Sequence, residues 1–295
     1  MSRNLLSRIA VAAIAIPIIL WICYTGGLWL FGMIALFATV ATWELLQGEK
    51  ISPRSLLYWL SYLAVAGCLT VAVVAVPFDD LTQERFIRLS FVIYLVVGGV
   101  VILPYFLLSG MILAMGKDQP AELFRRHSRL LWGVTYIGAL YPIVYLIGND
   151  YTLGSHVEPA RNGDLLLLLF GILWVGDTAA MGIGKLLGKH KLAPAVSPNK
   201  TVEGLIGGFV GAIAVSLIVW YWKFPFIPVY HFILLGFLCS LFGQLGDLVE
   251  SMWKRSLGLK DSSGIIPGHG GVLDRFDSLL FAAPVLYYYS QLFVR

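Results

Sequence analysis

Nine runs of about 20 apolar residues divide this sequence, and they leave the chain few places to fold other than a lipid bilayer. The runs cover residues 9–25, 28–46, 56–77, 88–108, 130–148, 163–183, 203–222, 226–246 and 276–293. A helix of that length crosses a hydrocarbon core of roughly 30 Å. The chain is 58% hydrophobic and 13% charged, whereas soluble domains average roughly 45–50% apolar and about 25% charged residues. We therefore predict an all-α, polytopic integral membrane helical bundle with about nine transmembrane helices.

The basic residues are distributed unevenly between the segments that join these runs. If the N-terminus is cytoplasmic, 16 of the 21 Lys and Arg residues fall in cytoplasmic segments and five fall outside. Because cytoplasmic loops carry an excess of Lys and Arg, this arrangement favours nine spans with the N-terminus cytoplasmic. An even number of spans stays open if residues 9–46 form a re-entrant pair.

The chain carries no repeat of 20–50 residues, no low-complexity segment and no long soluble insertion, which indicates one membrane domain. Within it, residues 1–150 form an N-terminal half of about five helices. We expect residues 151–295 to form a C-terminal half of about four helices, which carries the candidate catalytic motif loops on the cytoplasmic side. Cys23, Cys68 and Cys239 lie inside apolar runs, so we expect small buried hydrophobes rather than disulfides or a metal site.

Two charged features of the N-terminal half allow both a structural and a functional interpretation. The basic cluster from Lys117 to Arg129 could bind a lipid headgroup or a nucleotide, but a positive-inside signal beside anionic lipid is the favoured interpretation. Glu44 ends the second apolar run. We expect an interfacial carboxylate there, although a carboxylate at membrane depth is a functional candidate by default.

The first polar motif begins inside the sixth run, where Asp177 is costly unless it has a partner such as a cation. Glycines and lysines follow, and then the stretch from Ser197 to Gly204 leads into the seventh run. Glycines let a backbone approach a phosphate, and lysines supply charge for it. Helix capping by Ser197 or Thr201 and small-residue helix packing are the structural alternatives.

The second polar motif, residues 243–277, is far more specific, because acidic, basic and glycine residues alternate in it. Its carboxylates are hard oxygen ligands, which suit Mg²⁺ together with substrate phosphates. Its basic residues can neutralise phosphate oxygens, and His269 can donate to phosphate or serve as a structural loop histidine. The carboxylates are Asp247, Asp261, Asp274 and Asp277, and the basic residues are Lys254, Arg255, Lys260 and Arg275. Zinc is not favoured, because no Cys or second His lies nearby.

These residue types favour phosphoryl or nucleotidyl transfer at a membrane surface. The chain has no Walker loop and no Gly-x-Ser-x-Gly elbow. It also lacks a basic, aromatic surface of the kind that binds nucleic acid, and its net charge of +4 is explained by the cytoplasmic loops.

The spacing of residues 251–277 resembles the signature of the phosphatidate cytidylyltransferase (CDP-diacylglycerol synthase) family. The matching pattern is Ser251-x2-Lys254-Arg255-x4-Lys260-Asp261-x-Ser263-x2-Ile266-Pro267-x-His269-Gly270-Gly271-Val272-x-Asp274-Arg275-Phe276-Asp277. Asp177, the Gly184-Lys185-x2-Gly188-Lys189 run and the motif from Ser197 to Gly204 are similar to the family in the same order. The strong similarity covers residues 170–280. Trp253, where the family prefers an aliphatic residue or Phe, and Asn199, where many members carry a lysine, depart from the pattern.

The resemblance implies that phosphatidate and CTP react to give CDP-diacylglycerol and pyrophosphate in phospholipid biosynthesis, assisted by Mg²⁺. A second, monovalent cation is compatible with it. The implied catalytic residues are Asp247, Lys254, Asp274, Arg275 and Asp277. The implied cation ligands are Asp247 and Asp274, with Asp177 and Asp261 as further members. The implied substrate-binding residues are Lys185, Lys189, Ser197, Lys200, Thr201, Arg255, Lys260, His269, Gly270 and Gly271.

Two other functions stay open at this point. A CTP-dependent lipid or polyprenol kinase would use the γ-phosphate of CTP and release CDP. A transporter would carry its polar residues near the membrane midplane, whereas here they cluster at one face. We expect CTP, phosphatidate and the bilayer as partners, no nucleic acid, and either a monomer or a homodimer. The expected location is a bacterial inner membrane with the active site facing the cytoplasm.

Overall fold

The computed structural model describes residues 3–75, 101–116, 119–150 and 163–294, and these form helices over almost their whole length. The helices are α1 (Arg3–Thr25), α2 (Gly27–Gly48), α3 (Leu56–Ala75), α5 (Leu103–Ala114), α6 (Pro120–Gly148), α7 (Asp164–Leu187), α8 (Val202–Lys223), α9 (Val229–Ser256) and α10 (Leu273–Tyr289), followed by a π-helical turn, η2 (Ser290–Val294). The prediction of an all-α membrane protein is therefore confirmed, whereas the nine spans and the side of the N-terminus stay predictions.

Five of the described helices are long and apolar enough to cross a membrane, namely α2, α6, α7, α8 and α9. Shorter apolar helical stretches lie in α1, α3 and α5. Residues 88–100, the first part of the fourth expected span, lie outside the described residues. The structure thus agrees with a membrane protein, and its helices begin and end within a few residues of most of the expected runs.

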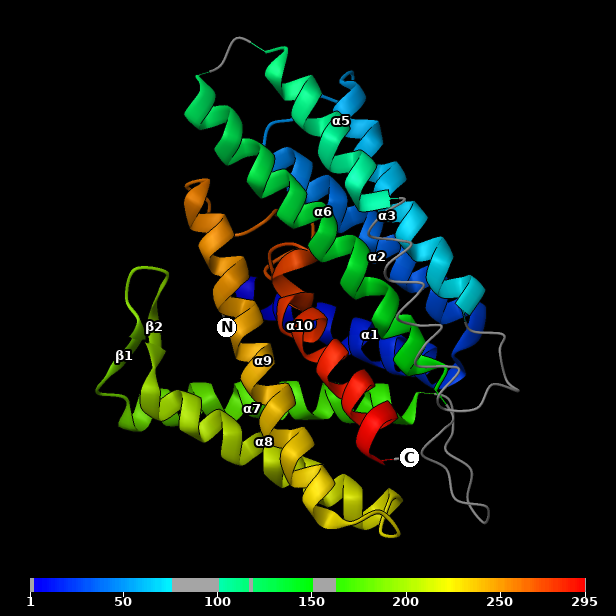
Figure 1. The fold of residues 1–295 in the computed structure, drawn as a ribbon. Helices are drawn as coiled ribbons and strands as arrows, with labels where there is room; N and C mark the ends of the chain where they lie inside the picture. The colour runs from blue at the N-terminus through cyan, green and yellow to red at the C-terminus, as the bar shows by residue number, and fades with distance from the viewer. Residues whose placement is uncertain (1–2, 76–100, 117–118, 151–162, 295) are drawn as a thin grey trace.

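Two differences from the sequence prediction concern the polar motifs. The eighth apolar run ends at residue 246, but α9 continues to Ser256, so the acidic and basic residues that follow the run are helical. Between α7 and α8 the chain forms an antiparallel hairpin of β1 (Lys191–Ala193) and β2 (Ser197–Thr201), in which Ala193 pairs with Ser197. The hairpin projects from the helices in Figure 1. Among the described residues it is the one sheet, and an isolated antiparallel bridge joins Ile266 and Gly270 in the loop before α10.

Helix packing joins the two halves of the chain around α10. Figure 1 shows α2, α3, α5 and α6 side by side, with α7 and α8 running together at the opposite end of the molecule. Helix α10 packs on α6, α7 and α9 and so contacts both groups. The close approach of α7 and α8 depends on small residues, because a Cβ at Gly204 would lie 2.8 Å from the Ala180 carbonyl oxygen and one at Gly211 would lie 2.7 Å from the Ala179 Cβ.

Candidate active site

The hairpin, α9 and the loop before α10 supply most polar side chains of the candidate site, and α2 adds Glu44. Lys200 on β2 places its Nζ 2.6 Å from Asp247 Oδ2 on α9. The Ser251 hydroxyl donates to the other Asp247 oxygen at 3.2 Å. The first and second polar motifs, far apart in sequence, therefore meet in one ion pair. The Asp247 side chain is 37% exposed, so its carboxylate can still be reached from outside.

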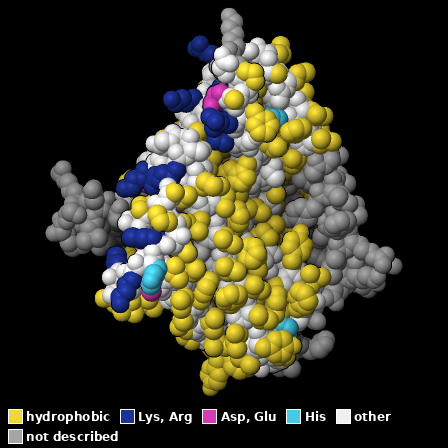
Figure 2. All heavy atoms as spheres, turned by 60° about the vertical axis from the view of Figure 1, so that its left-hand side comes forward, with side chains coloured by type: hydrophobic (Ala, Val, Ile, Leu, Met, Phe, Trp, Pro, Cys, Tyr) yellow, Lys and Arg dark blue, Asp and Glu magenta, His cyan; other side chains and the backbone are white. Residues whose placement is uncertain are grey.

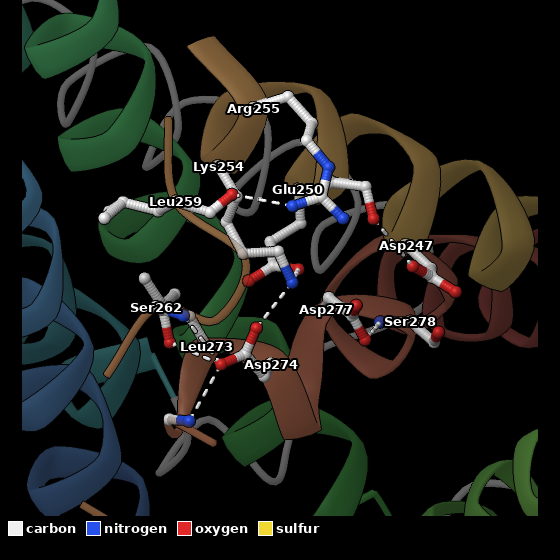
Figure 3. A network of polar contacts seen from close by, with 12 residues as sticks. Asp247, Glu250, Lys254, Arg255, Leu259, Ser262, Leu273, Asp274, Asp277 and Ser278 are labelled. Atoms are coloured by element: carbon white, nitrogen blue, oxygen red, sulfur yellow. Dashed lines mark hydrogen bonds and ion pairs between the residues drawn. The ribbon is translucent and has the colours of Figure 1, made fainter. Parts of the chain in front are cut away.

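Lys254 on α9 is held between two acidic side chains. Its Nζ lies 2.5 Å from Asp274 Oδ1 on α10 and 2.6 Å from Glu250 Oε2 one turn earlier on α9. Figure 3 shows this ammonium reaching from α9 to Asp274. The Glu250 and Asp274 side chains are only 1% and 3% exposed, and buried charges require such pairing. Glu250 lies three residues from Asp247 but was not among the predicted site residues, and the structure places it in the same ion-pair cluster.

The Asp274 carboxylate is saturated by donors from the protein itself. Its Oδ1 accepts from Lys254, while its Oδ2 accepts from the Ser262 N–H at 2.8 Å, the Ser262 hydroxyl at 2.9 Å and the Gly271 N–H at 2.8 Å. Such a carboxylate has little capacity left for a metal ion. In this arrangement Asp274 organises the loop before α10.

Glu44 performs the same task from the other half of the chain. Its Oε1 accepts from the Ser263 hydroxyl at 2.6 Å and the Val272 N–H at 2.8 Å. Its Oε2 accepts from the Leu273 N–H at 2.8 Å and lies 3.1 Å from the Ser262 hydroxyl, whose single proton it shares with Asp274. The side chain is buried inside the protein, since Glu44 has no exposed surface. The only sequence signal was a carboxylate at the end of an apolar run, where a charge is costly without partners.

The glycine-rich loop therefore wraps around the protein's own carboxylates. Gly270 has φ +84°, a left-handed conformation that glycine adopts without strain. At Gly271 an added Cβ would lie 1.9 Å from the Ser262 hydroxyl oxygen and 2.4 Å from Glu44 Oε1. These two glycines allow close packing against Glu44 and Asp274, and the Gly271 N–H is already used by Asp274.

We expect Gly271→Ala to lower both activity and thermal stability, because a methyl group there would push Ser262 and Glu44 apart. Gly264→Ala is the matched control in the same loop, since a Cβ there meets nothing within 4 Å. The measurement is the thermal unfolding midpoint of purified protein in detergent together with its rate of product formation. Equal behaviour of the two variants would show that the loop does not depend on this contact.

Three further carboxylates lie near one another without saturating partners. Asp277 on α10 is buried, and its Oδ1 accepts the Ser278 N–H at 2.6 Å. Asp277 and Asp247 repel each other electrostatically, and so do Asp277 and Asp177. Asp177 on α7 is exposed and also interacts with Lys200 and Arg275. Within the described part of the chain, no three His, Cys, Asp or Glu side chains converge closely enough to hold a metal ion by themselves.

In the first polar motif, Thr201 and Glu203 make contacts at the junction of the hairpin and α8. Thr201 is the N-cap of α8, and its hydroxyl oxygen accepts from the Gly204 N–H at 3.1 Å. Of the two residues expected to cap this helix, Thr201 does so, and Ser197 lies in β2. Glu203 accepts from the Lys189 N–H at 3.0 Å and pairs with the His190 ring at 2.6 Å. The hairpin is therefore tied to the start of α8 at its base.

Two residues predicted to bind substrate make only local contacts with the backbone. Arg255 donates to the Leu259 carbonyl oxygen at 2.7 Å, and His269 lies 3.4 Å from the Pro267 carbonyl oxygen. Six predicted site residues have exposed side chains, namely Lys185, Lys189, Arg255, Lys260, Asp261 and Arg275. Five of these six side chains are basic, which suits an anionic ligand.

Comparison with known proteins matches this chain over nearly its whole length. The model of the cytidylyltransferase family covers residues 6–293. A phosphatidate cytidylyltransferase of Staphylococcus epidermidis is 36% identical over 279 residues, which are 95% of this chain and 96% of that protein. The proteins of the same name from Staphylococcus saprophyticus and Staphylococcus aureus are 34% and 36% identical, again over 95% of this chain and 96% of each relative.

Proposed function

The chain belongs to the cytidylyltransferase family, and from this premise we propose that it converts CTP and phosphatidate into CDP-diacylglycerol and pyrophosphate. An oxygen of the phosphatidate phosphate attacks the α-phosphorus of CTP. The new bond joins that oxygen to the α-phosphorus, and the bond from the α-phosphorus to the β-phosphate oxygen breaks, so that pyrophosphate leaves. No general base is needed, because the second pKa of a phosphate monoester is about 6, so the phosphate is largely ionised at neutral pH.

The observation that carries this proposal is the meeting of Lys200 and Asp247 at the junction of the two motif loops. Catalysis of such a transfer depends mostly on positioning and on neutralising the charge of the triphosphate. Lys200 and Arg275 lie beside the open carboxylates and are placed to neutralise phosphate oxygens. Lys254 is already paired with Glu250 and Asp274, so its first contribution is to hold α9 and α10 in register.

The residues suit a divalent cation only in part. Mg²⁺ uses one or two protein carboxylates and takes its remaining ligands from phosphates and water. Asp247 fits this role, because its side chain is 37% exposed and it accepts from fewer protein donors than Asp274 does, namely Lys200 and the Ser251 hydroxyl. The Asp177 and Asp277 carboxylates both interact electrostatically with Asp247. Asp274 does not fit, because protein donors fill its acceptor positions. The cation, when bound, would supply charge neutralisation, and a second, monovalent cation is compatible with the same acidic cluster.

The membrane arrangement that supports this chemistry has nine spans, with the N-terminus and the motif loops in the cytoplasm, where CTP is found. In a bacterial inner membrane, the acyl chains of phosphatidate would stay in the bilayer while its headgroup reaches the interface. The same proposal holds for a monomer or a homodimer, because every residue it uses lies in one chain.

Asp247→Asn is expected to lower kcat by about 10²-fold, because a neutral amide replaces the reachable carboxylate. Purified enzyme in phosphatidate-containing micelles would be assayed with CTP, with pyrophosphate, CDP and CDP-diacylglycerol quantified separately. Chelation of divalent cations is expected to stop product formation by the unsubstituted enzyme.

The same assay separates the alternatives. Release of CDP instead of pyrophosphate would replace the proposal with a CTP-dependent lipid kinase. Full activity of Asp247→Asn at unchanged Mg²⁺ dependence would remove Asp247 from the cation site while leaving the reaction itself intact.

A further inference from the structure

A cavity of about 980 Å³ lies behind the candidate active site, between the end of α2, the start of α6 and the last turns of α9. On α9, Asp247 and Lys254 are seven residues apart and share the face that carries the site. Met252 and Trp253 line the cavity from the other side of the same helix, as the helical period of 3.6 residues requires. The cavity is therefore separate from the carboxylates of the proposed reaction, although one helix borders both.

The cavity has a basic wall. Lys50, Arg125, Arg126 and Arg129 line it, opposed by Glu49 and Glu122. Arg129 is paired with Glu49 at 2.7 Å, so these two charges compensate each other. Lys50 and Arg125 are exposed, and neither has an ion pair or a side-chain hydrogen bond within the described part of the chain. The wall thus carries a net positive charge that the described residues leave without a counter-ion.

Lys50 occupies an unusual backbone position for a lysine. It has φ +55°, and among the described residues no other non-glycine residue has a positive φ. It follows α2 in a turn where the Ile51 N–H donates to the Leu46 carbonyl oxygen, a helix end at which glycine is the usual residue. Arg126 holds this turn through a 2.8 Å hydrogen bond to the Glu49 carbonyl oxygen. A costly conformation is thus kept at a residue whose side chain lines the cavity.

Apolar and aromatic residues of α6 and α9 line the rest of the cavity. Phe124 and Met252 are exposed at the cavity, and Trp132 and Trp253 line it as well. Trp253 is 5% exposed, and its indole N–H has no hydrogen-bond acceptor among the described residues. Figure 2 shows Lys and Arg side chains gathered along one edge of the molecule beside a broad hydrophobic surface. A basic wall next to an apolar wall at such an edge matches a molecule with an anionic head and hydrocarbon chains.

We propose that this cavity binds the phosphate headgroup of an anionic glycerophospholipid other than the substrate, with its acyl chains along Phe124 and Met252. Lys50 and Arg125 face the phosphate. A lipid held there touches the back of α9, whose front carries Asp247 and Lys254, so the lipid composition of the membrane is coupled to the position of the site helix. If anionic lipid were attracted only by the overall positive charge of this surface, any basic residue there would contribute equally. A specific site instead depends on the basic residues that line the cavity.

Lys50→Gly tests the site without a folding penalty, because glycine suits the left-handed backbone at this position. Native mass spectrometry of the full chain in detergent would measure the retention of phosphatidylglycerol and of phosphatidylcholine. We expect the unsubstituted protein to prefer phosphatidylglycerol, and Lys50→Gly to weaken that binding about fivefold with no fall in the thermal midpoint. Fivefold corresponds to the roughly 1 kcal/mol that one basic residue contributes near an anionic membrane surface.

Arg54→Gly is the matched control, since Arg54 is exposed just after Lys50 and does not line the cavity. It should leave phosphatidylglycerol binding unchanged. Equal losses in the two variants, or no preference for phosphatidylglycerol in the unsubstituted protein, would overturn the proposal in favour of a diffuse surface charge. A rise in KM for phosphatidate in Lys50→Gly with unchanged phosphatidylglycerol binding would also overturn it, because the cavity would then be the substrate's path. The binding readout needs no turnover, so it is independent of the proposed reaction.

Discussion

Glu44→Gln is expected to inactivate the protein and to destabilise it by roughly 2–3 kcal/mol, although the two side chains have the same shape. Each Glu44 oxygen accepts one backbone N–H, from Val272 or from Leu273. A glutamine has only one oxygen, so its amide nitrogen must face one of these N–H groups whichever way it turns. The serine hydroxyls can rotate to adapt, but a backbone N–H cannot, and one buried donor is left without an acceptor.

The loss of activity should exceed the loss of folded protein. The loop that Glu44 organises also positions Asp274 and the start of α10, and a displacement of about 1 Å in a catalytic arrangement can cost about 10²-fold in rate. Glu122→Gln is a suitable control, because Glu122 is 53% exposed and lies 3.5 Å from Arg129. It should change the thermal midpoint little. Retention of full activity by Glu44→Gln at a temperature where it is folded would show that the loop does not depend on this carboxylate.

The sequence predicted the helices well for a physical reason. In lipid, a single apolar run of about 20 residues satisfies its backbone hydrogen bonds by forming a helix. Helices α2, α3, α7 and α8 therefore begin and end close to the runs that predicted them. The hairpin was missed because its strands are short and polar, and because it depends on Thr201 and Glu203, which make contacts that hydrophobic periodicity does not report. The apolar run ends at residue 246, before α9 ends at Ser256, because the last turns of α9 are charged.

The candidate site could be predicted only as a set of residue types. A carboxylate looks the same in sequence whether it binds a cation or accepts protein hydrogen bonds, so Asp247 and Asp274 received the same role. Only their contacts separate them, because Asp274 is saturated and Asp247 is partly exposed. Glu44 could not be assigned to the loop, since its backbone donors lie 228 and 229 residues away along the chain.

Lys254→Met is expected to give the largest loss of stability, about 3–5 kcal/mol, because it removes the shared counter-ion of two buried carboxylates. Glu250 and Asp274 would remain on facing helices with no cation between them. The measurement is the thermal unfolding midpoint in detergent. Lys191→Met serves as the control, since Lys191 is an exposed lysine of β1 and should shift stability by less than about 0.5 kcal/mol.

The double variant Lys254→Met/Glu250→Gln separates the structural role of this lysine from a direct role in the reaction. Removing the Glu250 charge leaves Asp274 as the one carboxylate of the pair still ionised, and Asp274 retains its hydrogen bonds from Ser262 and Gly271. Stability should therefore recover in large part. If activity stays lost while stability returns, Lys254 also contacts the phosphates during turnover. If activity returns together with stability, Lys254 acts as a counter-ion between α9 and α10, and the phosphate contacts belong to Lys200 and Arg275 instead.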